Sequence, residues 1–96
     1  MQNPISKVIN GNRYWLSDKA GKKLKTFING QWIYFGDPKY EHYFDRTGLL
    51  DKSLNHLDKK RRAGYRARAS KIVNGNGSLT VNDINSPNYH SFHILW

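Results

Sequence analysis

The chain has 96 residues, with 16 Lys and Arg against 7 Asp and Glu, and a formal charge of +9 at pH 7. This length predicts a single domain over residues 1–96, and the cationic excess makes polyanions, nucleic acid above all, the expected partners. The absence of cysteine excludes a disulfide scaffold and a thiolate zinc site. No run approaches the roughly 20 apolar residues of a membrane span, and the beginning of the sequence lacks the apolar run of a signal peptide, so a soluble protein that is not secreted is expected.

Tight turns are the first structural signal. An aliphatic residue followed by Asn-Gly, the pair best suited to a type I′ hairpin turn, occurs at 9–11, 28–30 and 73–75. The flanking residues do not repeat, so the pattern indicates common turn chemistry and no internal duplication. The middle turn joins two β-rich runs, 24–28 and 31–35, into a predicted hairpin.

An earlier strand over 13–17 is expected to pair with this hairpin and to complete a three-stranded antiparallel meander over 13–35. In the standard register Phe27 lies opposite Trp32, and the side chains alternate between two faces. One face carries Leu24, Thr26, Ile33 and Phe35, and the other carries Lys25, Phe27, Trp32 and Tyr34.

Because both faces carry large apolar groups, the sequence favours a sheet covered on both sides, by a main helix on one and by an aromatic tail on the other. The alternative for the second face is a platform on which unpaired bases stack, with Lys25 and Trp32 as contact residues.

The residues after the hairpin, 40–48, predict an ordered loop. Five of the seven acids lie between 37 and 58, immediately before the basic run, and they are expected to neutralise part of it. A main helix is then predicted over 57–72, because its residues are good helix formers apart from Gly64 and a stop signal follows at Asn74-Gly75.

A helical wheel divides the basic residues of this helix. Leu57, Tyr65 and Ile72 fall in one apolar arc, and Arg61 and Arg68 fall in the same arc, so these two are expected to snorkel, stack on an aromatic ring or pair with an acid. The far side of the wheel carries Lys59, Arg62 and Arg66.

The last predicted element is a short helix capped by Ser86 with Pro87 in its first turn. A short strand over 79–81 is expected before it. An aromatic series at helical spacing predicts that this tail docks on the sheet with its last ring buried, and it comprises Tyr89, Phe92, His93 and Trp96. The predicted fold class is therefore α+β, with a three-stranded meander, one main basic helix and a short aromatic helix.

The basic helix is the main candidate site. As a phosphate-binding surface it would use Lys59, Lys60, Arg62, Arg66 and Lys71, while Ala63, Gly64 and Ala67 keep part of the surface low enough for a nucleic-acid backbone to approach. The alternatives are a merely solvated face and a contact with protein or membrane.

Four histidines lie among carboxylates, which raises the question of a metal-dependent nuclease: His42, His56, His90 and His93. Their spacing matches no known motif, and nucleotide-binding and hydrolase motifs are absent. We therefore expect no enzymatic activity, no metal, no cofactor and no small-molecule substrate.

Three stretches in order, "YFGD..YEHYFD.TG", "HLDKKRRAGYRAR..KI" and "SPNYHSFHILW", resemble small basic proteins encoded by large DNA viruses, giant and phycodnavirus-like viruses among them, and by some phages. The resemblance covers most of the chain from Tyr34 onward, with Ala69 where a histidine is common in the family. It implies a viral origin, with location in the virion or the infected-cell interior, and it supplies no catalytic residue.

Two hypotheses follow. One is a non-enzymatic protein that binds nucleic acid, DNA in preference to RNA, through its basic helix in association with the packaged genome. The other is a minor structural protein of the virion, a capsid or cement component that makes protein contacts.

Overall fold

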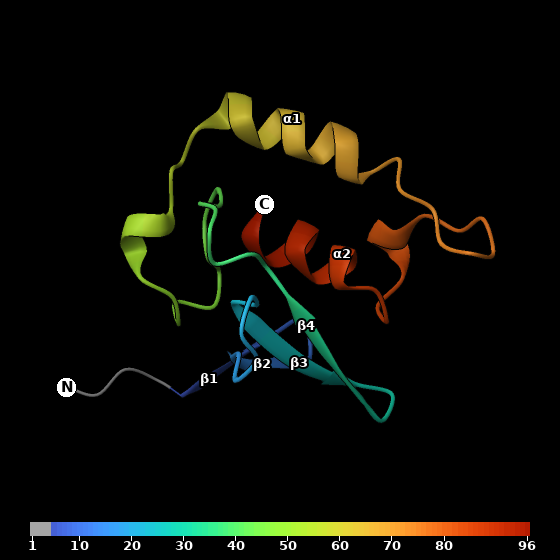
Figure 1. The fold of residues 1–96 in the computed structure, drawn as a ribbon, viewed down its shortest axis with the longest axis horizontal. Coiled ribbons are helices and arrows are strands. Elements are labelled where there is room, and N and C mark those ends of the chain that lie inside the picture. Colours follow the sequence, from blue (N-terminus) through green and yellow to red (C-terminus); the bar gives the residue numbers. More distant parts are fainter. Residues whose placement is uncertain (1–4) are drawn as a thin grey trace.

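Four antiparallel strands form one sheet in the order β1-β2-β3-β4 (Figure 1). The computed structural model describes residues 5–96 and places these strands at Ser6–Ile9 (β1), Asn12–Leu16 (β2), Leu24–Ile28 (β3) and Gln31–Phe35 (β4). The predicted α+β class agrees with this arrangement. The predicted three-stranded meander is wrong, because β1 adds a fourth strand.

The additional strand follows from the first Asn-Gly turn. Asn10 and Gly11 both have positive φ, 52° and 81°, as a type I′ turn requires, and Ile9 pairs with Asn12 across the turn. The four residues of β1, Ser-Lys-Val-Ile, are half polar and too few to predict a strand by pattern. These residues form a strand because they pair with β2.

The hairpin of β3 and β4 has the predicted register, with Phe27 opposite Trp32 and Ile28 opposite Gln31. Its Asn29-Gly30 turn also has positive φ at both residues. The predicted faces are confirmed as well: Leu24, Thr26, Ile33 and Phe35 point inward and are buried.

The helices lie on one side of this sheet. Helix α2 (Pro87–His90) continues into a π-helical turn (η3, Ser91–Leu95) that packs on the inner face, and helix α1 (Lys59–Ala69) lies beyond it (Figure 1). The order of the layers is therefore sheet, then segment 86–96, then α1. The expectation that helix and tail cover opposite faces is wrong, since both lie over the same face.

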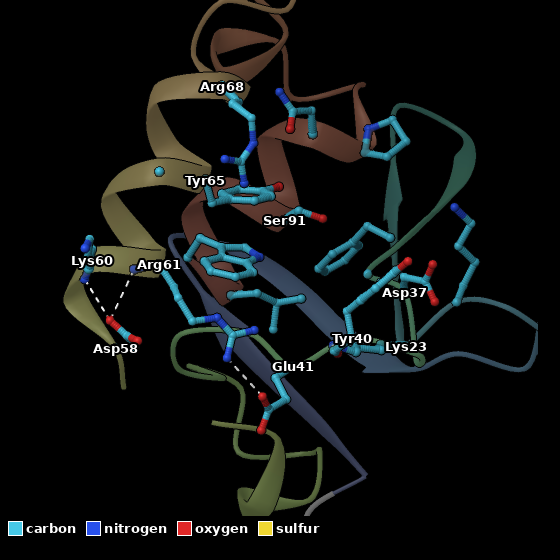
Figure 2. Close-up of a pocket in the computed structure, with 18 residues that line it drawn as sticks. Lys23, Asp37, Tyr40, Glu41, Asp58, Lys60, Arg61, Tyr65, Arg68 and Ser91 are labelled. Carbon is cyan, nitrogen blue, oxygen red and sulfur yellow. Dashed lines mark hydrogen bonds and ion pairs between the residues drawn. The ribbon is translucent and has the colours of Figure 1, made fainter. Parts of the chain in front are cut away.

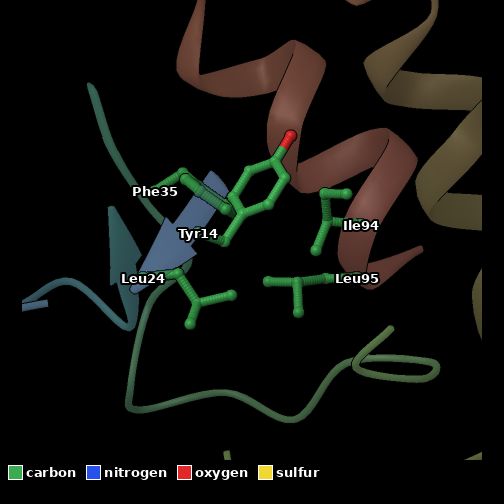
Figure 3. Close-up of a cluster of buried hydrophobic side chains, with 5 residues drawn as sticks. All are labelled: Tyr14, Leu24, Phe35, Ile94 and Leu95. Carbon is green, nitrogen blue, oxygen red and sulfur yellow. The ribbon is translucent and has the colours of Figure 1, made fainter. Parts of the chain in front are cut away.

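The central core joins the sheet to segment 86–96 (Figure 3). It consists of five side chains that are no more than 1% exposed: Tyr14, Leu24, Phe35, Ile94 and Leu95. Burial of such side chains is the main stabilising contribution, at about 1.5–3 kcal/mol each. Trp96 packs against this core and is partly buried, so the prediction that its ring is buried is met only in part.

One polar pair is enclosed in the core. The His90 ring bonds through Nε2 to the Ile84 carbonyl oxygen at 2.7 Å, which requires Nε2 to carry the proton, so the Tyr14 hydroxyl donates to Nδ1 at 2.9 Å. Burial raises the pKa of Tyr14 to about 12 and lowers that of His90. Both side chains are therefore neutral at physiological pH.

Helix α1 is shorter than predicted. Leu57 has a φ of +56°, which no α-helix accommodates, and the Asp58 carboxylate caps the helix by accepting from the backbone N–H groups of Lys60 and Arg61. The helix ends at Ala69, three residues before Ile72. Leu57 and Ile72, the proposed ends of the apolar arc, are exposed.

The remaining segments are loops with short turns. Residues 40–48 form the predicted loop, followed by a 3₁₀ turn at Lys52–Leu54 (η1). The short strand expected over 79–81 is reduced to one bridge between Val73 and Leu79, and Thr80–Asn82 (η2) is a second 3₁₀ turn.

Candidate nucleic-acid interface

One stripe of α1 faces segment 86–96, with members at i, i+3, i+4 and i+7: Arg62, Tyr65, Arg66 and Ala69. The Arg62 Nε–H donates to the Trp96 carbonyl oxygen at 2.8 Å, and its guanidinium lies 4.8 Å from the centre of the Tyr43 ring. The Arg66 guanidinium lies 4.0 Å from the centre of the Phe92 ring. Both arginines are partly buried, so the prediction that they point away from the packed face is wrong.

The exposed cations of α1 and of the turn after it form the candidate interface. We call the following set the α1 surface: Lys59, Lys60, Arg61, Arg68 and Lys71. Arg61 and Arg68 were expected inside the apolar arc, but both are exposed and neither belongs to the stripe that packs on segment 86–96. Arg61 pairs with an acid of the 37–58 segment, which is one of the three arrangements expected for it, at 3.0 Å from Glu41.

That ion pair is the only one that the α1 surface makes with any residue in 5–96. The small residues lie between its cations: Ala63 and Ala67 are exposed, and a Cβ added to Gly64 would meet only the Arg68 guanidinium, at 3.4 Å. The predicted low strip along the helix is therefore present. The strip leaves room for a polyanion backbone between the cations at 59–61 and those at 68 and 71.

A groove of about 840 Å³ runs beside this surface, between α1, segment 86–96 and the loop that follows β4 (Figure 2). Its floor is apolar and is formed by Phe35, Tyr65, Leu95 and Trp96. Five cations and three carboxylates also line it. The cations are Lys22, Lys23, Lys60, Arg61 and Arg68.

Each carboxylate of the groove already has a partner inside the protein. Asp58 caps α1, Glu41 holds Arg61, and Asp37 accepts from the backbone N–H of Lys39 at 2.9 Å. A hydrogen bond from a backbone N–H leaves the charge of a carboxylate in place, so the groove attracts anions because its five cations outnumber its three carboxylates, with Lys60 and Arg68 on the α1 side.

A buried lysine forms part of the opposite wall. Lys23 is 7% exposed, and its ammonium group donates to the Tyr40 carbonyl oxygen and lies 3.0 Å from His42 Nδ1. Burial lowers the pKa values of both Lys23 and His42. The His42 Nε2–H donates to the Asn55 side-chain oxygen at 2.7 Å, so this cluster joins the 40–48 loop to the sheet. The sequence contained no signal for this cluster.

The other face of the sheet is the second candidate region. We call it the outer sheet face, and it comprises Trp15, Lys25, Phe27, Trp32 and Tyr34. Because both helices lie over the inner face (Figure 1), Phe27 and Trp32 keep 50% and 45% of their surface exposed. The preferred interpretation of this face as a covered core face is wrong.

The predicted site residues therefore lie in three places. The α1 surface contains Lys59, Lys60 and Lys71, the packed stripe of α1 contains Arg62 and Arg66, and the outer sheet face contains Lys25 and Trp32.

No family model, curated protein or solved structure matches the chain. The resemblance to small basic viral proteins stays a prediction, and the site has to be interpreted from its own geometry.

Residues 5–96 contain neither a candidate metal site nor a candidate membrane-spanning helix. No group of three or more His, Asp or Glu side chains is arranged to hold a metal ion there. The histidines have structural partners instead, such as the Val81 carbonyl oxygen for His93 and the Asp58 backbone N–H for His56. None of the helices in this part of the chain has the length and apolar character needed to span a bilayer.

Proposed function

We propose that the protein is a nucleic-acid-binding protein that contacts the phosphate backbone through the α1 surface, without catalysing a reaction. The observation that carries this proposal is the set of five exposed cations, of which only Arg61 is held in an ion pair within 5–96. Exposed and unpaired cations retain their full attraction for phosphates, and each phosphate contact releases a condensed counterion.

The dimensions of the helix suit this role. An α-helix of 11 residues is about 16 Å long, which corresponds to about five base-pair steps of duplex DNA. Lys60 lies in the first turn of α1 and Lys71 lies two residues beyond the last residue of the helix, with the low strip at Gly64 between them in the sequence. A nucleic-acid backbone lying along the helix can therefore contact both ends at once.

The structure changes the residues to which this role is assigned. Arg62 and Arg66 are removed from the predicted phosphate ligands, because their guanidinium groups are engaged with Tyr43 and Phe92. Arg68 takes their place, since it is exposed and lines the groove beside α1.

Binding of a fluorescein-labelled DNA duplex, measured by anisotropy between 50 and 300 mM salt, tests the proposal. We expect Lys60→Glu and Arg68→Glu each to weaken binding and to reduce the log-log salt slope by about 0.9, the value for one lost phosphate contact. The matched control is Lys52→Glu, which makes the same charge change on the exposed η1 turn.

If Lys52→Glu weakens binding as much as the other two variants, net charge alone attracts the duplex and the proposal fails. If the parent protein binds no duplex and instead elutes as an oligomer or sediments with a protein partner, the α1 surface is a protein interface. That outcome would favour the structural-protein alternative.

A further inference from the structure

The outer sheet face carries an aromatic cluster that the α1 surface does not use. Trp32 is its centre, with ring centroids 5.0 Å from Phe27 and 5.3 Å from Trp15. Both contacts are T-shaped, with interplanar angles of 66° and 71°, so one ring of each pair presents its edge. These contacts therefore leave part of the Phe27 and Trp32 ring surfaces uncovered.

We infer that the outer sheet face is a second binding site, on which unpaired bases of single-stranded nucleic acid stack on Trp32 and Phe27. Exposed aromatic rings on an antiparallel sheet are a recurrent means of holding unpaired bases, because every base has a flat π-face. Two large rings that each keep about half of their surface in water are otherwise costly to maintain.

Strand register places the cluster together. Cross-strand pairing sets Phe27 opposite Trp32 and Lys25 opposite both Trp15 and Tyr34, so residues from three strands form one continuous surface. Contacts with neighbouring rings restrict the rotamers of Trp32 and Phe27. Little conformational entropy is therefore lost when a base stacks on it.

The charges around the rings favour a nucleic-acid strand over an apolar protein surface. The Lys25 ammonium lies 4.5 Å from the Trp32 ring centre, and the Lys19 ammonium lies 5.3 Å from that of Tyr34. Arg13 is exposed two residues before Trp15, on the same side of β2. The carboxylate in contact with this group is Asp18, at 3.4 Å from Lys25.

This inference does not depend on the proposed role of α1. In a duplex the bases are already stacked and paired, so the rings have nothing to contact, whereas the α1 surface contacts phosphates of either form. The two sites therefore predict different losses. Variants of the outer sheet face should affect single strands alone, and variants of α1 should affect duplexes.

The test is anisotropy of a labelled single strand of about 12 nucleotides, a length within the usual range for one binding domain, beside a duplex of the same sequence. We expect Trp32→Ala to weaken single-strand binding roughly tenfold, the loss of one stacked base, and to leave duplex binding unchanged. Phe27→Ala should act in the same direction. Phe44→Ala, which removes a ring that is 44% exposed in the 40–48 loop, is the matched control.

The inference is wrong if Trp32→Ala binds the single strand as tightly as the parent does. It is also wrong if Trp32→Ala weakens binding of the single strand and of the duplex equally, or if Phe44→Ala weakens single-strand binding as much as Trp32→Ala does. A parent protein that sediments as a dimer while Trp32→Ala is monomeric would also overturn it, because the face would then be an interface between two copies. Thermal unfolding of each variant ensures that folded proteins are compared. If Lys60→Glu leaves duplex binding unchanged while Trp32→Ala still loses the single strand, the α1 proposal fails and this one stands.

Discussion

The Tyr65 ring stacks on the Trp96 indole, with ring centroids 4.3 Å apart and planes inclined by 11°. Together with the hydrogen bond from Arg62 to the Trp96 carbonyl oxygen, this contact holds α1 to segment 86–96. That segment in turn packs on the sheet through Ile94 and Leu95. The candidate phosphate surface is therefore positioned by a helix that reaches the sheet through an intermediate layer.

Replacement of Tyr65 tests this connection. We expect Tyr65→Ala to lower the free energy of unfolding by about 2–3 kcal/mol, because it removes a stacked, mostly buried ring. For a domain of this size the unfolding temperature should fall by roughly 10 °C or more. Tyr65→Phe keeps the ring and should change little. Calorimetry of the two variants provides the measurement, and equal unfolding temperatures for the Ala variant and the parent would show that α1 is held elsewhere.

The arginines of α1 should separate into two groups. Arg62→Ala and Arg66→Ala are expected to cost about 1–2 kcal/mol each, because they remove cation–π contacts and, for Arg62, a charge-assisted hydrogen bond. Arg68→Ala should change stability by less than about 0.5 kcal/mol. Urea unfolding of the three variants checks this order. The helical wheel predicts the reverse order, so the measurement decides between the two assignments.

Two glycines should respond in opposite ways to alanine. Gly64 lies inside α1, and an added Cβ would make only one contact, at 3.4 Å with the movable end of the Arg68 side chain, so Gly64→Ala should stabilise the protein by about 0.5–1 kcal/mol through helix propensity. Gly36 has a φ of +80°, and an added Cβ would lie 3.1 Å from Leu95 Cδ1, so Gly36→Ala should destabilise the protein by about 1 kcal/mol or more. Chemical denaturation measures both, and a gain in stability at Gly36 would contradict the close packing of the loop on segment 86–96.

Stability should fall as the solution becomes acidic. His42 and His90 are fully buried, and desolvation lowers their pKa values below the ordinary value of 6.5. Below pH 6.5 the unfolded chain therefore binds more protons than the folded protein, and the free energy of unfolding decreases as the pH falls. We expect a loss on the order of 1–2 kcal/mol between pH 7 and pH 5. Urea titrations at these pH values check the sign, and NMR titration of both rings should show midpoints below 6.5. A flat stability profile would contradict the prediction.

Several elements were predictable because their causes are local. The Asn29-Gly30 turn sets the register of β3 and β4, since two positive φ values in a two-residue loop leave one pairing that continues both strands. Ser86 accepts from the Asn88 backbone N–H ahead of Pro87, as the capping pattern predicts. In both cases the signal and the structure lie within a few residues of one another.

Segment 86–96 was predictable as a helix and as a docking element, but the face it covers was not. Alternation along β3 and β4 shows that two faces differ, and both contain large apolar side chains. The distinction comes from Tyr14, Ile94 and Leu95, which complete a core with Leu24 and Phe35 on one face only. Shape complementarity between segments far apart in the chain leaves no periodic signal in the sequence.

By itself, the sequence determined the charge, the hairpin, the presence of a basic helix and the class of partner to expect, because these depend on composition and on neighbouring residues. The tertiary structure alone decided which cations are free. The positive φ of Leu57 and the cap at Asp58 exclude the presumed apolar anchor from α1, and stacking of Tyr65 on Trp96 then sets the rotation of the helix. A change in rotation exchanges buried and exposed cations without any change in sequence pattern, so Arg62 is packed and Arg68 is exposed.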